Sequence, residues 1–152
     1  MNEVWIRRRV GWSPQGGPTA LNWALWQPRY VAQSWPTEEM RPGFQYYACE
    51  DLTGGGRGIV ARATVTAVLK PTEVDSPETA YGLIADQLFD EDLMIDHESW
   101  RANAYNRTKE ISPWPQRVTA WRVSVEPVGP HLLPELARFP HTGWLQTDRI
   151  GL

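Results

Sequence analysis

Residues Met40–Val68, with the sequence MRPGFQYYACEDLTGGGRGIVARATVTAV, predict a strand, a tight turn and a second strand. The first strand, Phe44–Cys49, is aromatic and apolar, as residues in a sheet commonly are. The turn contains four glycines between residues 54 and 58, which adopt positive φ angles without a steric penalty. From Ile59 to Val68 an apolar face alternates with a mixed face, which is the period of a strand. The stretch therefore predicts a β-hairpin at the centre of an antiparallel barrel.

Outside this hairpin, strands are expected to outnumber helices. Period-two patterns and apolar residues predict further strands over 3–10, 117–128 and 144–150, and a short extended segment over 30–34. Pro71 is expected to end the strand that reaches Leu69.

The helices are expected to lie between the strands. Ser76-Pro77-Glu78 predicts the start of a helix that ends near Phe89, because proline suits the first helical position. Its buried stripe is expected at Tyr81, Ile84, Ala85 and Leu88. Shorter helices are expected over 20–26, 99–104 and 134–139. The whole pattern predicts an α+β fold, a mainly antiparallel β-barrel with flanking helices.

Length and composition indicate a single globular domain over residues 1–152. The chain has 152 residues, of which 41% are hydrophobic, enough for a core without metals or disulfides. No apolar run is long enough to cross a bilayer, and the first residues, MNEVWIRRRVGW, lack the apolar centre of a signal peptide. The single cysteine, Cys49, excludes an intrachain disulfide. We therefore expect a cytoplasmic protein with no membrane partner.

Charge is unevenly distributed along the chain, whose formal net charge is −3. Segment 71–100 contains nine acidic residues and neither lysine nor arginine, which leaves fifteen bases against nine acids elsewhere. Thirteen of the fifteen bases are arginine, which suits phosphates and base edges better than lysine does. Two interpretations follow: an acidic solvated helix on an ordinary surface, or a basic face that binds a polyanion.

Strong catalytic and cofactor motifs are missing from the sequence. GGGRG lacks the lysine followed by serine or threonine of a phosphate loop, and GxGxxG, HExxH, CxxC and GxSxG are not matched. His97, between Asp96 and Glu98, is either a metal ligand or an exposed residue of an acidic loop, and we expect the second. Cys49 falls in a predicted core strand and is expected to be a buried, inert thiol. We expect no cofactor, no metal site and no catalytic residue.

The nine tryptophans raise the alternative of an aromatic pocket for a flat ligand. A pocket that binds one base needs stacking faces, hydrogen bonds to the base edge and arginines for the phosphates. Trp5 and Trp121, inside predicted strands, are expected in the core. Trp26, beside Gln27, and Trp114 border loops and prolines and are the preferred pocket residues. For every tryptophan, plain core packing is the competing interpretation.

Arginines near the predicted turns are candidates for contact with a nucleic-acid backbone. Arg7, Arg8 and Arg9 are consecutive on the first strand, so at least one points to each face. An arginine inside a barrel needs a partner or a ligand. The candidates for backbone contact are Arg8, Arg9, Arg57 in the glycine turn and Arg117 after the proline turn.

The order of these elements resembles the EVE domain family of the PUA-like superfamily, which also includes YTH and ASCH domains. The resemblance covers most of the chain. It is carried by an aromatic opening strand, a tryptophan segment, a proline-glycine and aromatic strand, a glycine turn, and an aromatic-proline turn before a long strand. In this chain these are VWIRRRV, NWALWQP, RPGFQYYAC, GGGRGIVARATVTAVLKP and SPWPQRVTAWRVSVEPVGPHLLPEL.

This resemblance implies a pocket on a small barrel that holds a modified base of DNA or RNA, flipped from a duplex or presented by a single strand. By position, Trp26 and Gln27 correspond to the pocket aromatic and its polar neighbour. Trp114, or Trp100, supplies the opposing face, and Arg8 or Arg9 lines the rim. Tyr46 and Tyr47 lie on opposite faces of their strand, so only one faces the ligand, and Tyr47 is the candidate. A nuclease on another chain is an expected partner.

Two alternatives to this function remain open. The same pocket suits a regulatory domain that binds a free nucleotide or another planar small molecule. A hydrolase that uses acids of the stretch from Asp90 to Glu98 is the other alternative, for which metal-dependent turnover, abolished by Asp92→Asn or His97→Ala, would be the sign.

Overall fold

One mixed sheet with three helices makes up the described part of the chain. The computed structural model describes residues 4–8, 20–29, 36, 38–52, 54–132 and 144–147. The strands are β1 (Val4–Arg8), β2 (Leu21–Trp26), β3 (Gln45–Asp51), β4 (Arg57–Val74), β5 (Gln116–Leu132) and β6 (Trp144–Thr147). The helices are α1 (Pro77–Leu88), α2 (His97–Ala102) and α3 (Ala104–Glu110).

The strand order confirms the α+β, mainly antiparallel prediction. It is β2-β5-β4-β3-β1-β6, an open sheet in which β2 and β6 are the edges. Among the described strands, β1 and β3 pair in parallel and the other four pairings are antiparallel. The described residues show no closed barrel.

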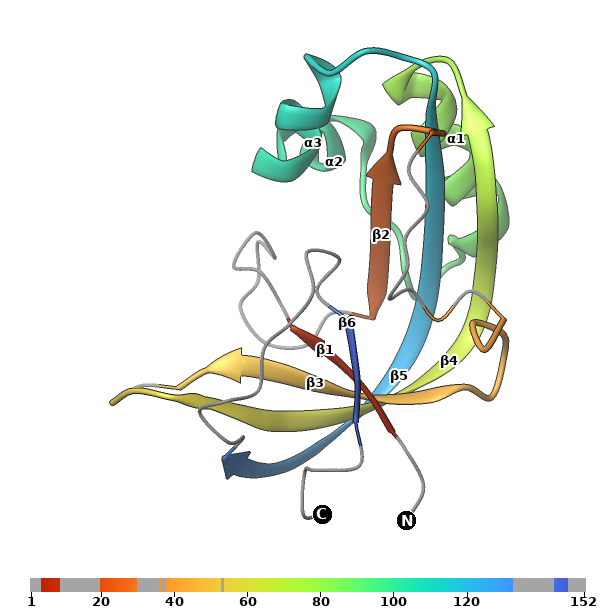
Figure 1. Cartoon of the computed structure of the whole chain (residues 1–152). Coiled ribbons are helices and arrows are strands. Elements are labelled where there is room, and N and C mark those ends of the chain that lie inside the picture. Colours follow the sequence, from red (N-terminus) through yellow and green to blue (C-terminus); the bar gives the residue numbers. More distant parts are fainter. Residues whose placement is uncertain are drawn as a thin grey trace.

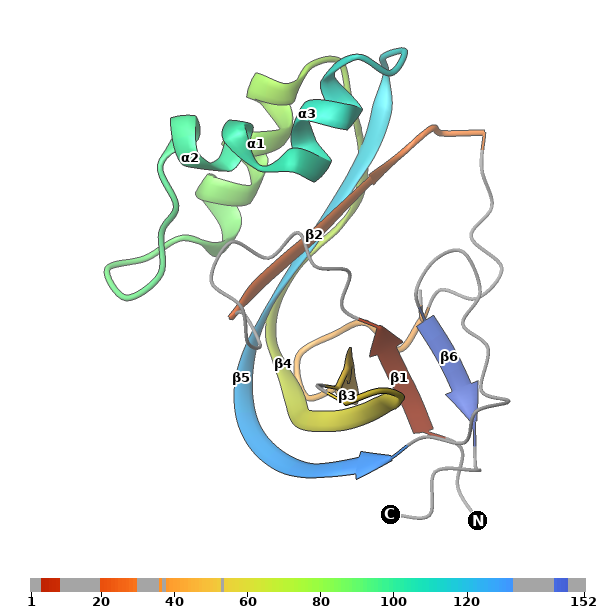
Figure 2. The ribbon, with the colours of Figure 1, turned by 90° about the vertical axis from the view of Figure 1, so that its left-hand side faces the viewer.

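The two longest strands, β4 and β5, connect two differently built ends of the sheet. At one end α1, α2 and α3 lie against β2, β4 and β5, whereas β1, β3 and β6 lie at the other end (Figure 1). Seen from the side, β4 and β5 curve around β3 and β1 (Figure 2). Each end has its own core. One is formed by β2, β4, β5, α1 and Trp100 of α2, and the other by Tyr46, Val65, Trp121 and Trp144.

The central hairpin forms as predicted. Residues 45–51 pair with 57–64 in antiparallel register, including Tyr46 with Ala63 and Tyr47 with Arg62. Gly54, Gly55 and Gly56 have φ values of 96°, 108° and 78°, which explains why the turn needs glycine. Cys49 is fully buried, as expected for an inert thiol.

The predicted helix over 20–26 is wrong, because this segment forms β2. Its residues pair with β5 from Leu21 opposite Arg122 to Trp26 opposite Arg117. Leu21, Trp23 and Leu25 alternate into the helix-covered core, so period two prevails over the apparent helical spacing.

The predicted strand end at Pro71 is also wrong, because β4 continues to Val74. The register between β4 and β5 shifts between Leu69 and Thr72. Such an irregularity accommodates a proline, which has no N–H to donate to the ladder.

Helix α1 begins as predicted, with the Ser76 hydroxyl accepting a bond from the Thr79 amide at 3.2 Å. Ala80, Ile84 and Leu88 are its buried residues, so Ala80 replaces the predicted Ala85, and Tyr81 is partly buried. The region predicted as one helix over 99–104 contains two, α2 and α3, which meet at Asn103. The predictions over 30–34 and 134–139 lie outside the described residues. None of the three described helices is long and apolar enough to span a bilayer.

Candidate binding groove

Trp100, one of the predicted pocket residues, lies in the core and is only 1% exposed. Its ring contacts those of Trp23 and Tyr81, with centroid distances of 6.1 and 5.6 Å. The competing interpretation, core packing, therefore applies to Trp100. Trp100 belongs to the core cluster that side chains of β2, β4, β5 and α1 form.

The predicted pair Trp26 and Trp114 does not form a sandwich around one slot. Trp114 is half-buried and packs against the helix-covered core. Trp26 alternates with Leu25, which belongs to that core, so its side chain points to the opposite face of the sheet. Gln27 donates its amide to the carbonyl of Pro113 at 2.5 Å, a bond that joins the end of β2 to the turn before β5.

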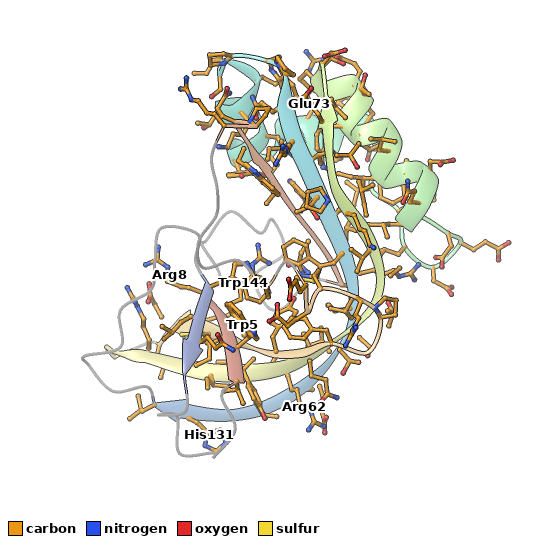
Figure 3. All side chains as sticks on the ribbon, turned by 45° about the vertical axis from the view of Figure 1, so that its right-hand side comes forward. Trp5, Arg8, Arg62, Glu73, His131 and Trp144 are labelled. Carbon is orange, nitrogen blue, oxygen red and sulfur yellow. The ribbon has the colours of Figure 1, made fainter. Side chains whose placement is uncertain are left out.

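Of the predicted backbone-contacting arginines that the structure describes, Arg117 lies apart from Arg8 and Arg57, which are both near Cys49. Arg117 is exposed, and its register partner Glu73 lies at the helix-covered end of the sheet, away from Trp5 (Figure 3). Arg57 forms an ion pair with Asp51 at 3.3 Å. Arg8 is half-buried on β1, in register with Cys49, and Arg9 lies outside the described residues. The three that are described, Arg8, Arg57 and Arg117, do not form one basic face.

Arg7 is the arginine that points into the curled sheet. Its Nη1 donates to Oδ1 of Asn22 at 2.6 Å, and its guanidinium carbon lies 4.7 Å from the centre of the Trp121 ring. Nε1 of Trp121 donates to the hydroxyl of Tyr46 at 2.9 Å. Burial raises the pKa of Tyr46, an effect opposed by the charge of Arg7, so this hydroxyl stays protonated at neutral pH. The expectation that an inward arginine needs a partner is therefore confirmed.

A groove of about 370 Å³ opens beside this interior cluster. It crosses four strands that are neighbours in the sheet, β6, β1, β3 and β4. Trp5 stands opposite Gln146 across the β1–β6 pair, and Tyr47 stands opposite Arg62 across the β3–β4 pair. The lining residues are Val4, Trp5, Glu39, Phe44, Gln45, Tyr47, Arg62 and Gln146.

The groove combines flat rings with hydrogen-bonding groups. Its lining includes three aromatic residues, Trp5, Phe44 and Tyr47, and the exposed Gln45 and Gln146. Trp5 and Phe44 pack against the cluster of Tyr46 and Trp144, whereas Tyr47 packs beside Ile6. The Trp5 ring is held edge-on by the buried Trp144 ring at a centroid distance of 6.1 Å, and the two lie together at the β1–β6 pair (Figure 3). An aromatic ring that a second ring holds in place, with amides nearby, suits a planar heterocycle with polar edges.

Of the predicted pocket residues, Tyr47 lines this groove. Trp121 is a core residue, as predicted, but Trp5, also expected in the core, is half-buried and lines the groove. The sequence has no signal for this role of Trp5, because it depends on β1 lying beside β3 and β6. Phe44 and Gln45 belong to the hairpin that the sequence predicts. Their position at the start of its first strand is a sequence signal for a functional role, because functional residues are common where loops meet strands.

The acidic segment has structural roles around α1 and α2. The Asp90 carboxylate accepts a bond from Arg122 at 2.5 Å and also bonds the amides of Asp92 and Leu93. The bond from Arg122 is the main reason that the pKa of Asp90 is lowered. Asp96 caps α2, and the amide of Ser99 is the main cause of its lowered pKa.

His97 is half-buried rather than exposed as expected, and its ring lies 4.8 Å from that of Tyr81. Among the described residues, no three His, Cys, Asp or Glu side chains gather where they could hold one metal ion. No family model, no curated protein and no solved structure matches this chain.

Proposed function

We propose that this chain is a PUA-like domain of the EVE type that binds, without catalysis, a nucleic acid through one modified base. The groove at β6-β1-β3-β4 is the proposed binding site. The observation that carries the proposal is a groove whose lining includes three aromatic residues, Trp5, Phe44 and Tyr47, and two glutamines, Gln45 and Gln146. The order of elements along the chain, which resembles that family, supports it independently.

The size and make-up of the groove support a ligand of about one base with its sugar. Its volume of about 370 Å³ falls within the usual range of small-molecule sites. Stacking of a base on an aromatic side chain contributes roughly 1–3 kcal/mol. The amides of Gln45 and Gln146 each offer a donor and an acceptor, which is what base edges require.

Arg7 supports a nearly closed, barrel-like sheet. The arginine is on β1 and its partner Asn22 is on β2, an edge strand at the far end of the strand order. Their side chains meet at 2.6 Å because the sheet curls until its two ends approach. The groove lies beside this curl, at the strands β6, β1, β3 and β4.

A second candidate function, binding of a free nucleoside or another planar small molecule, is favoured by the pairing of Arg62. This guanidinium lines the groove and forms an ion pair with Glu126 on β5. Its charge is therefore already compensated, and the described lining residues offer no other cation for a phosphate. In this case binding would be nearly independent of salt.

The test is binding of fluorescently labelled single strands that carry either a modified or a plain cytosine or adenine, at two salt concentrations. The proposal expects one modified base to be preferred and Tyr47→Leu to abolish this preference in a protein that remains folded. Trp26→Ala is the matched control, because Trp26 is also half-buried but does not line the groove. Equal binding of modified and plain strands would contradict base reading. If Trp26→Ala lost the preference for the modified base and Tyr47→Leu kept it, the binding site would not be this groove.

A further inference from the structure

The described lining of the groove contains one acid and one base, and the charge of the base is already taken up by an ion pair with a residue outside the lining. Its charged members are the exposed carboxylate of Glu39 and the guanidinium of Arg62. Arg62 stands opposite Glu126 in the β4–β5 register, and the two form an ion pair. Because Glu126 compensates Arg62, the carboxylate of Glu39 is the uncompensated charge at the groove.

The aromatic rings add to this preference for positive charge. Indole and phenol rings have electron-rich faces that attract cations, most strongly when the cation is removed from water. Trp5, which has an indole, and Tyr47, which has a phenol, both line the groove that Glu39 lines. A phosphate in this position would face both the ring faces and the carboxylate, which disfavour an anion.

We propose that the groove selects a planar heterocycle that carries a positive charge, such as a base alkylated on a ring nitrogen. The proposal rests on the function proposed above, since it names the chemical class of the base held in that groove. A neutral base gains stacking and hydrogen bonds there. A cationic base gains in addition the attraction of the ring faces and of Glu39.

The experiment compares two isomers that differ in charge. N1-methyladenosine has a positively charged ring at neutral pH, whereas N6-methyladenosine, which has the same heavy atoms and one proton fewer, has a neutral ring. Neither carries a phosphate, so the protein's attraction for a nucleic-acid backbone plays no part. Calorimetric titration of the full chain at neutral pH should show the cationic isomer binding roughly tenfold more tightly.

A pair of neighbouring acids provides matched variants. Glu39→Gln keeps the size of a lining side chain and removes its charge, and it should weaken binding of the cationic isomer about threefold. The same change should leave the neutral isomer's binding unaffected. Glu38→Gln removes an equal charge from an adjacent exposed residue that does not line the groove, and should leave both isomers unaffected.

The possible outcomes separate this inference from the proposed function. Equal binding of the two isomers, or tighter binding of the neutral one, overturns the preference for a cation and leaves base binding in place. Binding of neither isomer overturns both. Equal effects of Glu39→Gln and Glu38→Gln would show that the preference arises from overall charge and not from the groove.

Discussion

The guanidinium carbon of Arg7, on β1, lies 4.7 Å from the centre of the Trp121 ring, on β5. These strands are not neighbours, because β4 and β3 lie between them in the sheet. The contact therefore crosses the inside of the curl. Arg7 also donates to Asn22 on β2, so one cation links β1 to the β2–β5 pair, with which β1 has no backbone ladder. The contacts of Arg7 therefore stabilise the curvature of the sheet beside the groove.

Removing the Arg7 cation should therefore destabilise the fold. Arg7→Met leaves the carbonyl of Asn22, which is only 7% exposed, without this donor and removes the cation from the Trp121 ring. We expect a loss of about 2–4 kcal/mol in the free energy of unfolding, measured by urea denaturation at neutral pH.

Arg8→Met is the matched control for this change. Arg8 is the next residue of β1 and points to the other face of the sheet, so its replacement should cost about 0.5 kcal/mol or less. An equal loss in the two variants would contradict the role assigned to Arg7.

Tyr105 should protect the free edge of β2. Its hydroxyl accepts a bond from the amide of Leu25 at 3.1 Å and donates to the carbonyl of the same residue at 3.0 Å. Tyr105→Phe removes both bonds from a buried backbone segment, and we expect a loss of about 1–3 kcal/mol. Hydrogen exchange should accelerate at the Leu25 amide.

Tyr47→Phe provides the comparison, because the Tyr47 hydroxyl has no hydrogen bond among the described residues. Its stability should change by less than about 0.5 kcal/mol. If exchange at Leu25 is the same in both variants, the hydroxyl of Tyr105 does not protect the edge.

The parts of the fold that the sequence predicts are those in which local chemistry decides the structure. Gly54, Gly55 and Gly56 fix the hairpin turn, alternation fixes β4 and β5, and Ser76 with Pro77 fixes the start of α1. Each of these signals lies within a few residues of the element it specifies.

The parts that could not be predicted depend on contacts between distant segments. The LNWALW segment becomes a strand because it pairs with β5, which is far along the chain, and β4 continues past Pro71 because β5 supports an irregular ladder there. The groove needs Trp5, Phe44 and Gln146 to meet across β1, β3 and β6. A single sequence gives no measure of which of its many tryptophans will meet in this way.

Trp100 should contribute to stability rather than to binding. The side chain is 1% exposed and packs between Trp23 of β2 and Tyr81 of α1. Trp100→Ala should cost about 3–5 kcal/mol in unfolding free energy, since a large cavity remains. Trp100→Phe keeps an aromatic ring there and should cost less. If Trp100→Ala lost ligand binding without loss of stability, the core assignment would be wrong.

Cys49 should make the fold less stable at alkaline pH. Burial is the main reason that the pKa of this thiol rises from 9.0 to about 11. Below pH 9 the thiol is protonated in both states, so it has no effect on the pH dependence. Above pH 9 the unfolded chain loses the proton while the folded chain retains it, so the free energy of unfolding falls between pH 9 and 11, by up to about 3 kcal/mol.

The Cys49→Ala variant isolates this effect, because it has no thiol to ionise. Denaturation curves measured from pH 7 to 11 should show a constant difference between the variant and the unchanged chain up to pH 9. Above pH 9 the free energy of unfolding of the unchanged chain should fall relative to that of the variant. Tyr46, whose pKa burial also raises, lowers stability in both proteins above pH 10 and so cancels in the comparison. Parallel curves across the whole range would show that the buried thiol ionises as readily as an exposed one.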